Sequence, residues 1–109
     1  MLTTRQEPRA AVVTVNADRI DAAVAIEFKD QMRAAIADTS GRVVLDLSQV
    51  DFVDSSGLGA IVAAMKLMPT GRPLDLAGLS PNVDKVFRMT RMDSIYTIHR
   101  TIAAAVPDA

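Results

Sequence analysis

The sequence contains no cysteine, no tryptophan and a single histidine, His99, among its 109 residues. The absence of cysteine excludes disulfide bonds, thiolate chemistry and cysteine-ligated zinc. It also fits a reducing compartment, so we expect a cytoplasmic protein. His99 is the one candidate for a base at neutral pH, and no obvious partner for it exists in the sequence, so we expect it to be structural or on the surface.

Neither sign of charge dominates, because 12 basic and 13 acidic side chains leave a formal net charge of −1. Nucleic-acid binding depends on positive charge that displaces counterions from phosphates, so we expect no nucleic-acid partner. The apolar runs are far shorter than the roughly 20 residues that span a bilayer, and residues 1–7 lack a signal-peptide core. We therefore expect no membrane insertion.

Signatures of catalysis and cofactor binding are also missing. No glycine-rich loop carries a lysine at P-loop spacing, and no glycine pair flanks a serine, since Gly57 and Gly59 both follow the serines. Asp54 is similar to the phosphorylated aspartate of a response-regulator receiver, but Asn16 and Ala17, not an acidic pair, follow the first predicted strand. No His or carboxylate group has metal-ligand spacing. We expect neither an enzyme nor a cofactor.

What the sequence does contain is a regular alternation of β-branched and amphipathic segments. Strands are predicted over residues 11–15, 42–47, 74–77 and 95–98, and helices over 22–37, 55–68, from 80 onward and at 103–105. The segment Val43-Val44-Leu45 is apolar on both faces, as a central parallel strand requires. We predict a single α/β domain over residues 1–109, with a mostly parallel central sheet of about 4–5 strands and alternating helices. Residues 1–9 are expected to be flexible or to form a short edge strand.

Helical periodicity assigns an inward face to each predicted helix. The inward residues are Val24, Phe28, Met32 and Ile36 in the first helix, Leu58, Ile61, Val62, Met65 and Met68 in the second, and Val83, Val86 and Phe87 in the third. Asp21 is predicted to cap the first helix. Ser80, followed by Pro81 at the first helical position, is predicted to cap the third.

The segment from Asp51 to Gly59 places two hydroxyl side chains at a predicted strand-to-helix turn. An extended stretch ends at Asp54, and Ser55 and Ser56 begin the helix. The unpaired backbone N–H groups of a helix N-terminus favour a negative charge, including a phosphate. A serine at this turn is therefore either a plain helix cap or a residue that a kinase modifies, and both interpretations remain open from the residues alone.

The run Asp54-Ser55-Ser56-Gly57-Leu58-Gly59 resembles the signature of the STAS family, the bacterial anti-sigma factor antagonists. The resemblance covers nearly the whole chain from Ala11 onward and implies a STAS-type fold. It also includes Ile20-Asp21, residues 43–50, Phe52-Val53, Leu79-Ser80-Pro81 with Val83 and Phe87, and residues 89–98.

The resemblance implies a phosphorylation-controlled partner switch in bacterial transcription and stress signalling. In such proteins a GHKL-type serine kinase, which is also the anti-sigma factor, phosphorylates the serine after the aspartate, here Ser55. The unphosphorylated form binds this kinase, and sigma factor is released. Phosphorylation adds two negative charges beside Asp54 and Asp21 and breaks the complex. A PP2C-type phosphatase reverses the modification, and the free protein is expected to be a monomer.

Ser55 is the predicted phosphoacceptor, with Ser56 as the alternative. The predicted partner-binding residues are Asp21, Asp54, Ser55, Ser56, Gly57, Leu58 and Gly59. Asp54 is expected either to orient the Ser55 hydroxyl or contact the kinase, or to be a second cap, and Ser56 to bond backbone N–H groups of the first turn. The two glycines either let the turn and helix approach closely or keep the surface small for a partner. Met89 and Met92 are further candidates for a partner surface.

Two positions depart from the family pattern. Asp18 stands where a glycine usually precedes Asp21, and aspartate tolerates positive φ better than most residues. Arg91 stands where a glycine often follows the third helix, which makes a left-handed C-terminal cap less comfortable. The alternative function is a constitutive STAS scaffold subunit of a lipid or anion transport system, in which Ser55 is only a cap.

Overall fold

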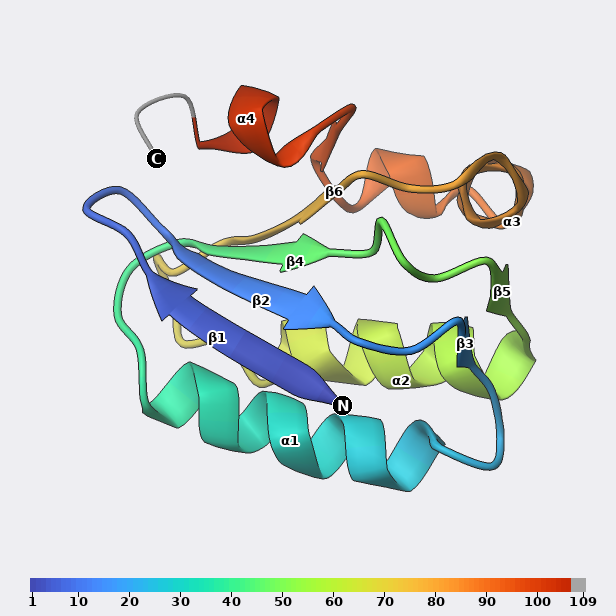
Figure 1. Cartoon of the computed structure of the whole chain (residues 1–109), viewed down its shortest axis with the longest axis horizontal. Coiled ribbons are helices and arrows are strands. Elements are labelled where there is room, and N and C mark those ends of the chain that lie inside the picture. The colour runs from blue at the N-terminus through green and yellow to red at the C-terminus, as the bar shows by residue number, and fades with distance from the viewer. Residues whose placement is uncertain (107–109) are drawn as a thin grey trace.

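A five-stranded sheet forms the centre of the computed structural model, which describes residues 1–106 (Figure 1). The strand order is β1-β2-β4-β6-β7; β1 runs antiparallel to β2, and the remaining neighbours are parallel. The bounds are Leu2–Gln6 (β1), Ala11–Val15 (β2), Val43–Asp46 (β4), Leu74–Ala77 (β6) and Ile98–His99 (β7). This confirms the predicted α/β fold with a mostly parallel sheet, in which Leu2–Gln6 is an edge strand.

The pleat of the central strands separates two apolar clusters. Val13, Leu45 and Leu76 point into the main core, which lies between the sheet and the helices α1 (Ala25–Ala37) and α2 (Ser55–Lys66). Val12 and Val44 point to the opposite face, which α4 (Ile102–Ala105) covers in part (Figure 1). Because these strands are buried on both faces, Ala11-Val12-Val13 and Val43-Val44-Leu45 appear in the sequence as continuous apolar runs.

The helix α1 buries the predicted face but begins later than predicted. Phe28, Met32 and Ile36 are buried. The predicted cap at Asp21 is wrong, because Val24 occupies the N-cap position and makes no side-chain cap bond. Asp21 instead forms a turn before the helix: its Oδ1 accepts from Ala23 N at 3.1 Å, and its carbonyl accepts from Val24 N. The Asp21 side chain thus forms a local Asx-type turn instead of a helix cap.

The helix α2 packs through small side chains more than through the predicted large ones. Its buried residues are Gly57, Ala60, Ile61 and Ala64. Of the predicted stripe, Ile61 alone is fully buried, and the other four are only partly buried against the core. The small residues bring the helix backbone close to the sheet, so the longer side chains flank the contact.

The third helix, α3 (Pro81–Met89), has the predicted N-terminus, where the Ser80 side chain accepts from Val83 N and Pro81 follows. Its buried residues are Val83 and Phe87, whereas Val86 is only partly buried. After it, Arg91 adopts a left-handed φ of 61°, the one non-glycine residue to do so within residues 1–106. The expected left-handed position is therefore occupied by a residue with a Cβ.

The strand predicted over residues 95–98 exists, but it begins three residues later than predicted. Ile95 follows a short 3-10 helix, η1 (Met92–Ser94), and β7 spans Ile98–His99. Tyr96 is buried, its ring meets Phe87 edge-on at 6.1 Å between centroids, and its hydroxyl donates to the Ile61 carbonyl at 2.8 Å. Tyr96 thus anchors this segment in the core, and pairing with β6 begins only after it, where Leu76 N donates to the Thr97 carbonyl and Ile98 lies opposite Leu76. Burial also raises the pKa of Tyr96.

A separate two-stranded sheet lies at the end of the domain where α2 begins. Its strands are β3 (Arg19–Ile20) and β5 (Phe52–Val53), which pair in parallel (Figure 1). The carbonyl of Asp18 accepts from both Asp51 N and Phe52 N and extends this pairing. Asp18 does not have positive φ, so aspartate is accommodated there without backbone strain.

Candidate functional site

Asp54 caps α2 and ties two loops together. Its backbone is extended, its Oδ1 accepts from Gly57 N at 2.8 Å, and its Oδ2 accepts from Ala22 N at 3.2 Å. The second bond joins the start of α2 to the loop after Asp21, so the structure brings the two predicted carboxylates to one edge. The cap is therefore Asp54, and the interpretation of Ser55 as a plain helix cap is wrong.

Ser55 and Ser56 are the first two residues of α2, and both are exposed. Neither hydroxyl makes a hydrogen bond to any group in residues 1–106, so the predicted bonding of Ser56 to the first turn is not observed. Since Asp54 satisfies the Gly57 N–H, the hydroxyls have no capping role to fill. They are open to a partner at a helix N-terminus, where a phosphate is electrostatically favoured.

The two glycines of the motif have different surroundings. A Cβ built on Gly57 would lie 1.8 Å from the carbonyl oxygen of Ile20, so only glycine lets α2 approach β3. A Cβ built on Gly59 would meet nothing within 4 Å. Gly59 is exposed and lies one turn after Ser55 on the same helix face. The close-approach role thus holds for Gly57, and Gly59 has no role within residues 1–106 that the packing explains.

Arg19 and Phe52 complete this surface, although the sequence did not single them out as site residues. Parallel pairing sets them opposite each other, and because their neighbours Ile20 and Val53 are buried, both side chains point outward. The Arg19 guanidinium lies 5.6 Å from the centroid of the Phe52 ring, and its Nη1 is 3.6 Å from Asp21 Oδ2. The available signal was the strand alternation around Phe52, which turns a large aromatic ring away from the core.

We call the surface formed by these residues the Ser55 edge; Asp21 and Asp54 are half-buried in it and the other members are exposed. It comprises Arg19, Asp21, Phe52, Asp54, Ser55, Ser56 and Gly59. Of the other predicted partner residues, Gly57 is buried and Leu58 is half-buried. Met89 is 73% exposed at the end of α3, and Met92 is packed against the core.

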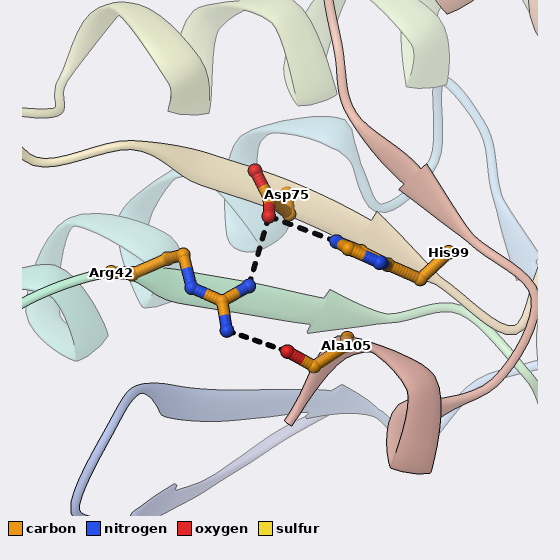
Figure 2. Close-up of polar contacts among 4 residues, drawn as sticks. All are labelled: Arg42, Asp75, His99 and Ala105. Atoms are coloured by element: carbon orange, nitrogen blue, oxygen red, sulfur yellow. Dashed lines mark hydrogen bonds and ion pairs between the residues drawn. The ribbon is translucent and has the colours of Figure 1, made fainter. Parts of the chain in front are cut away.

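A second polar group lies on the α4 face of the sheet, where the sequence offered no site. Asp75 Oδ2 accepts from Arg42 Nη1 at 2.9 Å and lies 3.0 Å from His99 Nε2 (Figure 2). Arg42 Nη2 also donates to the Ala105 carbonyl, at the end of α4. We call these four residues the Asp75 network. An aspartate inside the otherwise apolar strand Leu74–Ala77 was the signal that could have located it.

Two further classes of site are not found within the described part of the chain. No group of three or more His, Cys, Asp or Glu side chains in residues 1–106 could hold a metal ion. None of the helices in that range combines the length and apolar character that crossing a membrane requires.

The chain matches the family model of the STAS domain over residues 1–105. The chain belongs to the STAS domain family. It is also 30% identical over 87 residues to BtrV of Bordetella bronchiseptica, described as a candidate anti-sigma factor antagonist, and the match covers 79% of this chain and 75% of that protein.

Solved structures share the fold of this STAS domain. An anti-sigma factor antagonist of Mycobacterium paratuberculosis superposes with a TM-score of 0.87 at 22% identity, covering 98% of this chain and 91% of that one. The Bacillus cell fate determinant SpoIIAA in its phosphorylated form gives a TM-score of 0.70 at 18% identity, covering 98% and 97%. The murine anion transporter Slc26a9 gives 0.68 at 20% identity, covering 78% of this chain but 14% of the transporter.

Proposed function

We propose that this STAS domain is an anti-sigma factor antagonist that works as a phosphorylation-controlled partner switch, with Ser55 as the modified residue. The carrying observation is that Ser55 is exposed at the N-terminus of α2 with an unbonded hydroxyl, while Asp54 performs the capping that a serine would otherwise supply. The similarity to BtrV over 79% of the chain supports the same function.

The proposed modification is a phosphoryl transfer from ATP. The Ser55 Oγ forms a bond to the γ-phosphorus, the bond between that phosphorus and the β,γ-bridging oxygen breaks, the hydroxyl proton passes to a base of the kinase, and ADP leaves. The STAS domain supplies only the nucleophile and its position. The catalytic base and the metal-bound nucleotide belong to the kinase, which we infer to be of the GHKL type and to be the anti-sigma factor as well.

Phosphorylation would act on the partner contact more than on the fold. The phosphate carries about −1.5 to −2 charge at pH 7 and would lie beside the carboxylates of Asp54 and Asp21. The helix N-terminus tolerates this charge within the domain. A partner that covers the same surface would have to desolvate all three groups, which favours dissociation. A PP2C-type phosphatase would restore binding.

Gly59 supports a partner contact at this surface. Glycine within a helix costs about 1 kcal/mol relative to alanine, and no neighbour within residues 1–106 requires it here. A partner backbone that passes close to α2 would require it. The proposed contact therefore extends at least one helical turn beyond Ser55.

The test is phosphosite mapping by mass spectrometry on the protein from its native cells, across growth and stress conditions. We expect one phosphate, on Ser55, whose occupancy varies with condition. Strains carrying Ser55→Ala and Ser56→Ala serve as a matched pair: the first should abolish the modification and the second should retain it. An unmodified Ser55 in every condition would instead direct the search to transporter subunits, in which the domain is a fixed scaffold.

A further inference from the structure

The side chain of Phe52 is unusual for its place in the fold. It belongs to a strand, yet it is 48% exposed, and the guanidinium of Arg19 covers one face of the ring. Arg19 is held in turn by Asp21, at 3.6 Å between Nη1 and Oδ2. The ring therefore points outward in the free protein with Arg19 against one face, and its remaining surface faces solvent.

A kinase that modifies Ser55 would approach the domain within reach of Phe52. Phosphoryl transfer requires the reacting atoms to approach within about 3–3.5 Å, so the kinase active site surrounds the Ser55 hydroxyl. Phe52 lies three residues earlier, at most about 11 Å away along the chain. An ordinary interface of about 800 Å² per partner extends roughly 16 Å from its centre. An interface of that size centred on Ser55 would therefore include the Phe52 ring.

We propose that Phe52 is the apolar anchor of the interface with the kinase that phosphorylates Ser55, and that Arg19 is the positioning residue that holds the ring outward. This inference rests on the proposed function. The partner would present an apolar pocket beside its active site that receives the exposed edge of the ring. Aromatic side chains dominate such interfaces, and a ring that is already held loses little conformational freedom on binding.

The expected effect follows from the exposed area. A phenylalanine side chain offers about 200 Å², so an exposed fraction of 48% leaves about 100 Å² to be covered. At the lower bound of the usual free energy per unit of apolar area buried, covering that area corresponds to roughly a thirtyfold change in affinity. Since the anchor does not touch the reacting atoms, the change should appear in KM and not in kcat.

Ile95 provides a matched control. It is 50% exposed, nearly the same fraction as Phe52, but it lies beside Met65 and Met68 at the other end of α2. The twelve residues of that helix separate the two ends by about 17 Å. Truncation of Ile95 therefore removes a similar apolar surface at a distance from Ser55.

The experiment measures initial rates of Ser55 phosphorylation with the kinase activity fractionated from native cells on wild-type protein and ATP. We expect Phe52→Ala to raise KM roughly thirtyfold with kcat within about twofold, Phe52→Leu to give an intermediate KM, and Ile95→Ala to match wild type. Arg19→Ala should raise KM about threefold, because the ring loses its support. Thermal unfolding of each variant shows whether it is folded at the assay temperature; if Phe52→Ala is not, Phe52→Leu decides.

The two levels of the proposal fail in different ways. Equal KM values for the Phe52 variants and Ile95→Ala, with wild type fully modified on Ser55, would overturn the anchor and leave the partner switch intact. Wild-type protein that no cellular kinase modifies on Ser55 would overturn both. A fall in kcat at constant KM for Phe52→Ala would also contradict the anchor, because it places the ring at the reacting atoms.

Discussion

The Ser55 edge and the Asp75 network are both polar clusters on one small domain, but only in the Asp75 network do all of the polar side chains have partners. In the Asp75 network the Asp75 side chain is 12% exposed and contacts both Arg42 and His99, and Arg42 also donates to the Ala105 carbonyl (Figure 2). At the Ser55 edge two hydroxyls make no bond within residues 1–106, and an aromatic ring faces solvent.

This difference distinguishes a cluster that stabilises the fold from a surface that is available to bind another molecule. Buried polar groups in a stable domain are paired with one another, because an unpaired one costs about 1–3 kcal/mol. The Asp75 network obeys this rule and holds α4 on the sheet. Exposed groups without partners cost little in water, and so they are available to another molecule. The polar groups of the Asp75 network are therefore paired within the domain, whereas the hydroxyls of the Ser55 edge are left for a partner.

The largest expected effect comes from Gly57, the one buried residue between Asp54 and Gly59. Gly57→Ala places a Cβ 1.8 Å from the Ile20 carbonyl oxygen, so α2 must move away from β3. We expect a loss of about 3 kcal/mol or more in the free energy of unfolding. Urea denaturation measures it. A stable, correctly folded variant would show that the two elements do not approach closely.

The second-largest expected effect is the loss of stability when the Asp75 network is disrupted. Asp75→Ala leaves the Arg42 guanidinium and His99 without their shared carboxylate on a largely buried face. We expect a loss of about 2 kcal/mol in unfolding free energy and faster hydrogen exchange in α4. Ser55 phosphorylation should continue at the wild-type rate in the folded fraction. A specific loss of phosphorylation would link the two regions and contradict their separation.

Gly59→Ala should act on the Ser55 edge in the opposite direction. The new methyl group meets open space, so the helix gains about 1 kcal/mol of stability. Binding to the kinase should weaken about tenfold, because the methyl occupies space that a partner backbone needs. Calorimetry of unfolding and of binding measures both terms. A variant that is more stable and binds normally would remove Gly59 from the interface.

The smallest expected effect tests backbone strain outside both regions. Arg91 has a left-handed φ of 61°, which a residue with a Cβ adopts at some cost. Arg91→Gly should raise the unfolding free energy by roughly 0.5 kcal/mol, since glycine removes the strain but gains freedom in the unfolded chain. A shift in the thermal midpoint reports it. Loss of stability would indicate that the Arg91 side chain supports the turn before η1.

Local features of this domain could be predicted from the sequence, and contacts across the chain could not. The position of Ser55 at a helix N-terminus follows from neighbouring residues. The choice of Asp54 over a serine as the cap depends on backbone geometry, because both side chain types suit that role. The stacking of Arg19 on Phe52 requires the parallel pairing of β3 with β5. His99 meets Asp75 only because β7 lies beside β6.

The segment around Tyr96 was predicted incorrectly because its conformation also depends on contacts with distant residues. Its apolar residues predicted a strand, but burial of one ring and one hydroxyl bond to Ile61 decides its conformation. Periodicity cannot distinguish a short strand from a loop that is anchored by an aromatic side chain. The prediction of the buried α2 residues was incomplete for a related reason. The helix lies so close to the rest of the domain that the small residues Gly57, Ala60 and Ala64 make the contact, and hydrophobicity alone does not reveal this distance.

The most direct test of the account compares the affinity of the same partner for three forms of the purified domain: unmodified, phosphorylated on Ser55, and phosphorylated on Ser56. The partner is the kinase fraction that modifies wild-type protein. The partner switch predicts tight binding of the unmodified form and at least about hundredfold weaker binding of the Ser55 phosphoprotein, with unchanged far-ultraviolet circular dichroism. Equal affinity of the unmodified and Ser55-phosphorylated forms would contradict the central claim.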